Sequence, residues 1–95
     1  MQYEIVLSPE AIEDLKHLNA RDRAKVKELM EVHLRHEPAK ISKSWIKRLR
    51  GIHRPQYRLR MDDFRIFYDL DQTKVEVLAI ITKAEASRWL ERIGE

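Results

Sequence analysis

The stretch YRLRMDDFRIFY, residues 57–68, predicts a β-hairpin. Two runs rich in apolar and aromatic residues flank Asp62-Asp63, and a two-residue loop joins antiparallel strands. Because directly opposed residues share a face and faces alternate along each strand, this turn sorts the side chains into two sets. The first set is Arg58, Arg60, Arg65 and Phe67. The second, which we interpret as a core face packed on helices, is Tyr57, Leu59, Met61, Phe64, Ile66 and Tyr68.

The arginine-rich set places Arg60 directly opposite Arg65. Like charges in this position destabilise a sheet by roughly 0.2–1 kcal/mol unless an anion, or a carboxylate such as Asp69, lies between them. Arginine keeps its charge near neutral pH and its planar fork suits phosphate, while Phe67 would add a surface on which a base stacks. Arginines chosen for solubility and edge protection are the alternative, although lysine and glutamate serve that purpose as well. The pattern favours a phosphate-binding face, provided that the register does not slip.

The flanking sequence predicts helices and further strands around this hairpin. Ser8 is a candidate N-cap with Pro9 in the first helical position, and Pro38 ends a second helix. The inward face of that second helix is expected to carry Val26, Leu29, Met30, Val32 and Leu34. Residues 37–56 remain open between a helical turn and an irregular arm. The expected strands are 3–7, 57–61, 64–70 and 74–81, and the expected helices are 9–18, 22–36 and 84–93.

The predicted fold class is α+β, with a small antiparallel sheet packed on one side by an N-terminal helical hairpin and a short C-terminal helix. A chain of 95 residues is expected to form a single domain, residues 1–95, with one core.

The charge is concentrated in one part of the chain. Residues 40–65 contain nine basic and two acidic residues, whereas the rest contains ten basic and fourteen acidic residues. A basic block in an otherwise acidic chain indicates a polyanionic partner, although a solvated surface has the same composition.

Composition also excludes several classes of site. The chain has no cysteine, so it has no disulfide and no thiolate metal site, and its two glycines exclude a glycine-rich phosphate loop. His33 and His36 have a metal-compatible spacing, but only Glu37 lies nearby as a third ligand, so we predict no metal and no cofactor.

No run is apolar and long enough for a membrane span and no signal peptide is evident, so a cytoplasmic protein without a membrane partner is expected.

Three segments together resemble a known family. KRLRG at residues 47–51, the hairpin YRLRMDDFRIFY and VEVLAIITK at residues 75–83 are similar to the RelE/ParE superfamily of type II toxin–antitoxin toxins. The resemblance covers nearly the whole chain and implies a microbial-ribonuclease-like fold. It also implies a cognate antitoxin as partner, in a toxin–antitoxin hetero-oligomer.

Two activities occur in this superfamily. RelE-like members cut mRNA in the A site of the ribosomal 30S subunit, and ParE-like members poison DNA gyrase. The resemblance implies the RelE-like activity, a metal-free attack of the ribose 2′-OH on the adjacent phosphate; a gyrase inhibitor and a degenerate, non-catalytic nucleic-acid-binding homologue are the alternatives. The residues expected to carry catalysis are Arg58, Arg60, Arg65 and Lys83. Those expected to bind RNA are Lys47, Arg48, Arg50, Arg54, Phe67 and Trp89.

The C-terminal segment departs from the RelE-like pattern. No tyrosine or histidine follows Tyr68, and Ala84 stands where a further cation is usual. Arginine is a poor base because its pKa is so high. The general base and acid are therefore unassigned from the sequence, with Glu85 and His53 as candidates for proton transfer.

Overall fold

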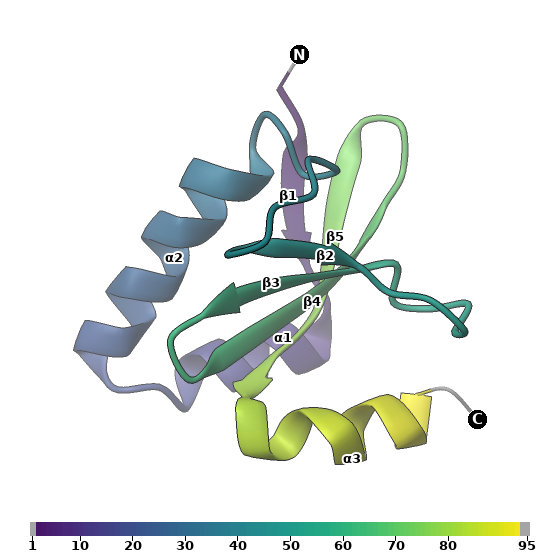
Figure 1. Cartoon of the computed structure of the whole chain (residues 1–95). Coiled ribbons are helices and arrows are strands. Elements are labelled where there is room, and N and C mark those ends of the chain that lie inside the picture. Colours follow the sequence, from purple (N-terminus) through teal and green to yellow (C-terminus); the bar gives the residue numbers. More distant parts are fainter. Residues whose placement is uncertain (1, 94–95) are drawn as a thin grey trace.

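The computed structural model describes residues 2–93, which form a five-stranded sheet and three helices (Figure 1). The spatial strand order is β1-β5-β4-β3-β2. The elements are β1 (Glu4–Leu7), α1 (Pro9–Lys16), α2 (Ala20–Leu34), β2 (Ile46–Arg48), β3 (Tyr57–Met61), β4 (Phe64–Leu70), β5 (Lys74–Thr82) and α3 (Lys83–Ile93). The predicted α+β class is confirmed, with helices and strands close to the expected positions.

The sheet is mixed rather than wholly antiparallel. Strand β1 pairs in parallel with β5, with Ile5 beside Val75, whereas the other neighbouring strands are antiparallel. Parallel neighbours need a long crossover connection, and most of the chain separates β1 from β5. The segment left open in the sequence includes β2, a short edge strand on which Ile46 lies opposite Leu59.

Helices α1 and α2 cover one face of the sheet. The predicted N-cap is confirmed, since Ser8 Oγ accepts a hydrogen bond from the Ala11 amide at 3.1 Å, and Asn19 caps α2. Tyr68 is fully buried here, and its hydroxyl donates to the Pro38 carbonyl at 2.6 Å. The predicted inward position of Val32 is wrong, because that side chain is 64% exposed. The buried residues of this core are Ala11, Val26, Met30, Leu34, Ile46, Leu59, Met61, Ile66, Tyr68, Val75, Val77 and Ile80.

Helix α3 covers the opposite face, so the expectation of helices on one side only is wrong. Its apolar stripe contributes Trp89 to a second core with Phe67, Leu78 and Ala79. The Trp89 indole and the Arg92 guanidinium both donate to Glu10 Oε1 on α1, at 3.2 and 2.7 Å. Figure 1 shows α3 leaving the end of β5 and running beneath the sheet. No helix among residues 2–93 combines the length and the apolar character needed to cross a membrane.

Candidate active site

The central hairpin has the register that the sequence predicts. Arg60 lies opposite Arg65 and Arg58 lies opposite Phe67, around a turn at Asp62 and Asp63. Asp62 has a φ of 48°, a left-handed conformation that aspartate tolerates better than most residues. The three arginines therefore lie on one face of β3 and β4, opposite the face that packs on α1 and α2.

An open cleft of about 580 Å³ lies at the turn end of this hairpin. It is lined by Ser44, Trp45, Arg60, Asp62, Asp63, Arg65 and Lys83. Lys83 is the first residue of α3, and its amide donates to the Asp63 carbonyl at 2.7 Å, which brings the start of α3 to the turn. Three of the four residues predicted to carry catalysis thus meet in one cleft, although they come from β3, β4 and α3.

Arg65 is held firmly in this cleft. Arg65 is only 7% exposed. Its Nη1 donates to the carbonyls of Asp62 and Phe64, at 3.0 and 2.9 Å. These two carbonyl dipoles offset part of the repulsion from Arg60 across the strand pair. Asp69, which the sequence suggested for this task, pairs elsewhere. Arg60 itself is exposed, so its guanidinium can meet a ligand.

Arg58 is half-buried, one position further from the turn on the same face. Within residues 2–93 its Nε is buried and has no hydrogen-bond partner. Burial lowers the pKa of the Arg58 guanidinium, and the charges of Arg65 and Arg60 lower that pKa further. An unpaired buried donor is costly, and an anion on this face would satisfy it. Lys47 lies opposite Arg58 on β2 and adds a cation to the same face.

Phe67 and Trp89 do not offer exposed rings for base stacking, so that expectation is wrong. They are 1% and 5% exposed and stack on each other, with ring centroids 5.0 Å apart and planes inclined by 17°. The cause is α3, which covers this part of the arginine-bearing face. The spacing of Ala86, Trp89 and Leu90 at helical intervals was the signal for this packing.

Trp45 is the exposed aromatic residue of the cleft, and sequence reasoning did not assign it to the site. It is 41% exposed and stacks on His33, with ring centroids 4.9 Å apart. Burial lowers the pKa of His33 in this contact. No sequence signal places Trp45 here, because its position depends on how the segment before β2 crosses the sheet edge.

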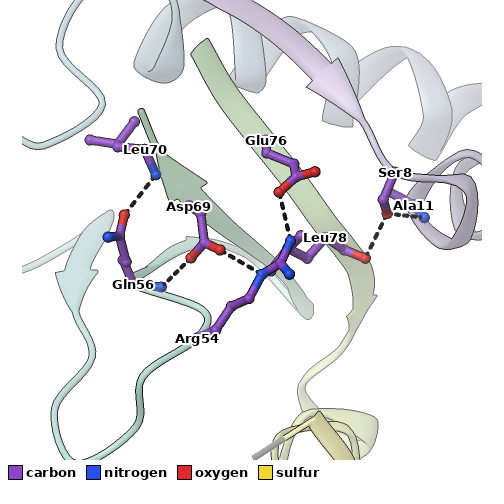
Figure 2. A network of polar contacts seen from close by, with 8 residues as sticks. All are labelled: Ser8, Ala11, Arg54, Gln56, Asp69, Leu70, Glu76 and Leu78. Atoms are coloured by element: carbon purple, nitrogen blue, oxygen red, sulfur yellow. Dashed lines mark hydrogen bonds and ion pairs between the residues drawn. The ribbon is translucent and has the colours of Figure 1, made fainter. Parts of the chain in front are cut away.

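Two of the arginines predicted to bind RNA have other surroundings. Arg48 pairs with Tyr57 and so lies on the face opposite the three arginines, where its guanidinium stands 5.0 Å from the Tyr57 ring centroid. Arg54 bridges two strands: its Nε donates to Asp69 at 2.7 Å and its Nη2 donates to Glu76 at 2.6 Å (Figure 2). Through these contacts, Arg54 holds the segment between β2 and β3 against β4 and β5. Arg50 lies exposed in that segment.

Replacing Arg54 with alanine is expected to lower the free energy of unfolding by less than about 1 kcal/mol, because half-exposed ion pairs are screened by water. Asp69→Ala is expected to cost more, since Asp69 also accepts the Gln56 amide at 2.8 Å (Figure 2). Urea unfolding of both variants at low and high salt checks this order, and the loss in Arg54→Ala should shrink at high salt. An Arg54→Ala loss that exceeds that of Asp69→Ala contradicts it.

Glu85, one candidate for proton transfer, caps α3 instead. Its carboxylate accepts hydrogen bonds from the Thr82 amide at 3.0 Å and the Thr82 hydroxyl at 2.9 Å, and these bonds lower its pKa. It does not line the basic cleft. His53 lies exposed between β2 and β3, also away from the cleft lining. Among residues 2–93, no three His, Cys, Asp or Glu residues are grouped to hold a metal ion.

Comparisons with known proteins identify the family and the fold of this chain. The family model described as the ParE toxin of the type II toxin–antitoxin system parDE matches residues 5–87. The RelBE2 toxin–antitoxin complex from Mycobacterium tuberculosis contains a chain 26% identical, with a TM-score of 0.73 over 87% of this chain and 100% of that chain. A mutant of Escherichia coli RelE in the free state is 24% identical, with a TM-score of 0.72 over 96% and 93% of the two chains.

An archaeal RelE from a RelE–RelB complex of Pyrococcus horikoshii is 21% identical, with a TM-score of 0.70 over 87% of this chain and 97% of that chain, and shares the fold. A comparison with curated protein sequences gives no significant match. Because the family model covers most of the chain, this chain belongs to the ParE toxin family within the RelE/ParE superfamily of type II toxin–antitoxin toxins.

Proposed function

We propose that this toxin cleaves mRNA on the ribosome. The observation that carries the proposal is the meeting of Arg60, Arg65 and Lys83 in one open cleft. Cations from three elements converge there on a space that can admit a phosphodiester. Arg58 on β3 and Lys47 on β2 extend the positive face beyond the cleft, and a positively charged groove suits a single-stranded nucleic acid.

The cleft is suited to stabilise a phosphoryl transition state. When the ribose 2′-OH attacks the adjacent phosphorus, negative charge grows on the non-bridging oxygens. The two carbonyl partners of Arg65 fix its orientation in advance, so little reorganisation of its side chain is needed when this charge appears. Arg60 and Lys83 supply further positive charge from opposite sides of the turn. The ribosome would orient the mRNA for in-line attack, which a shallow open cleft cannot do alone.

Inhibition by a cognate antitoxin is part of the proposal. Relatives with this fold were solved as toxin–antitoxin complexes, including the RelB–RelE complex from Methanococcus jannaschii. By analogy, this chain would be stored in the cytoplasm as a hetero-oligomer with its antitoxin and would act on ribosomes once released.

The test is an mRNA integrity assay on translating ribosomes, with cut sites mapped by primer extension. We expect ribosome-dependent cuts with the wild-type chain and about 100-fold slower cutting with Arg60→Ala, which removes one exposed cation from the cleft. Arg21→Ala is the matched control, because Arg21 is an exposed arginine on α2, away from the cleft. Intact mRNA with the wild-type chain, or equal cutting by both variants, contradicts the proposal.

Inhibition of DNA gyrase is the second candidate function. It is favoured by the matching family, whose name is that of the ParE toxins. A gyrase assay on supercoiled plasmid distinguishes the two: accumulation of cleaved DNA together with intact mRNA would replace the nuclease proposal. Wild-type cuts in mRNA without cleaved DNA would remove the gyrase alternative.

A further inference from the structure

We infer that Asp63 is the general base of the cleft, taking the proton of the attacking 2′-OH. This inference rests on the proposed ribonuclease function and names the proton acceptor that the sequence left unassigned. It is carried by the position of Asp63 in the cleft lining, beside Arg60, Arg65 and Lys83.

The groups in the cleft that can exchange a proton are few. The lining residues with suitable side chains are Asp62, Asp63 and Lys83, since arginine stays protonated and the Ser44 hydroxyl is a very weak base. Lys83 is cationic and cannot accept a proton. The carboxylate of Asp62 forms an ion pair with the ammonium group of Lys25 on α2, so it already has a partner.

Asp63 has no ion-pair or side-chain hydrogen-bond partner within the part of the chain that the structure describes. It is also well anchored, because its carbonyl accepts the Lys83 amide at 2.7 Å and its neighbours belong to the β3–β4 turn. The backbone that carries this free carboxylate is thus fixed at the cleft. Cations outnumber carboxylates in the lining, so a phosphate can still bind beside it.

The proposed step is balanced within the RNA and the cleft. As the 2′ oxygen forms its bond to phosphorus, the 2′ proton passes to the Asp63 carboxylate. The bond from phosphorus to the 5′ oxygen then breaks, and that oxygen keeps the electron pair and takes a proton from water in the open cleft. The products are a 2′,3′-cyclic phosphate and a free 5′-OH, and Asp63 returns its proton to water.

The test compares Asp63→Asn with Asp62→Asn in single-turnover cleavage on saturating ribosomes. Both variants remove one negative charge from the same turn and keep an acceptor of the same size, and asparagine tolerates the left-handed backbone at position 62. We expect Asp63→Asn to cut about 100-fold more slowly than Asp62→Asn, because only the first loses a base. The ribosome concentration that gives half of the maximal rate should be the same for Asp63→Asn as for the wild-type chain. Asp63→Glu should restore part of the rate.

The pH profile separates a base from a structural role. The charged groups around Asp63 are Asp62 on its own turn, Arg60 from β3, Arg65 from β4 and Lys83 from α3. With the base present, removal of the 2′ proton does not depend on hydroxide, so the rate should change little between pH 6 and 8. Without it, hydroxide must remove the 2′ proton, so the rate of Asp63→Asn should rise about tenfold per pH unit.

Three results overturn the inference, and they are distinguishable. If the wild-type chain cuts and Asp63→Asn cuts as fast as Asp62→Asn, the inference fails while the ribonuclease function stands. If Asp63→Asn is slow but its pH profile matches that of the wild type, Asp63 is a positioning residue and not the base. If the wild-type chain leaves mRNA intact, the proposed function and this inference both fail. Thermal unfolding of each variant establishes that it is folded before its rate is compared.

Discussion

Replacing Arg65 with alanine is expected to slow mRNA cleavage about 1,000-fold and to abolish growth arrest when the toxin is expressed. Arg65 is the most constrained cation of the cleft, because its guanidinium is fixed by the Asp62 and Phe64 carbonyls. A cation held in place beside the developing charge stabilises the transition state with little reorganisation, and removing one preorganised donor costs on the order of 10²–10³ in rate. Loss of the turn contacts would add to this effect. Single-turnover cleavage and colony counts after induction measure the two outcomes.

The Arg65→Lys variant separates charge from geometry. Lysine keeps the positive charge but lacks the planar guanidinium, whose Nη1 donates to both carbonyls, so we expect a rate between those of the wild type and of Arg65→Ala. Urea unfolding of both variants reports whether the turn is weakened. Full toxicity of a folded Arg65→Ala protein would contradict the ribonuclease proposal, since the best-oriented cation would then be dispensable.

Replacing Phe67 with alanine is expected to lower the free energy of unfolding by about 3–5 kcal/mol. Phe67 is 1% exposed and stacks on Trp89, so its removal leaves a cavity between the sheet and α3. Small domains are stable by only about 5–15 kcal/mol, so this loss removes a large fraction of the free energy of unfolding. The midpoint of urea unfolding, followed by tryptophan fluorescence and circular dichroism, gives the loss.

Val32→Ala is the matched control for this prediction. Val32 is also apolar, but it lies 64% exposed on α2, so we expect a change within about 0.5 kcal/mol. Similar losses from Phe67→Ala and Val32→Ala would mean that α3 does not hold the second face closed. Phe67 would then be accessible, as the sequence alone suggested.

The hairpin shows how much a short sequence determines. Its register follows from the length of the turn between two strands and from the alternation of side chains, and a slip of one residue would move every apolar side chain of the hairpin out of the core. The cap of α1 is equally local, since Ser8 contacts an amide three residues away. These local rules placed Arg58, Arg60 and Arg65 on one face.

The surroundings of Arg54, Arg48 and Trp45 have a different origin. Arg54 looks like a free cation in the sequence, but its partners Asp69 and Glu76 lie on β4 and β5, far along the chain. Arg48 could be assigned to a face only once its segment was known to be a strand paired with β3. Trp45 joins the cleft through the same segment. In each case the outcome depends on contacts between distant segments, for which a sequence window holds no signal.

The sequence by itself determined the hairpin, its register, the cap of α1 and the arginine-rich face, because turn length, side-chain alternation and capping act within a few residues. Only the tertiary structure decided that α3 closes the second face, buries Phe67 under Trp89 and brings Lys83 to the turn beside Asp63. An amphipathic pattern requires a helix to bury its apolar stripe but does not say against which surface. That choice depends on which sheet face is left uncovered once the whole chain has folded.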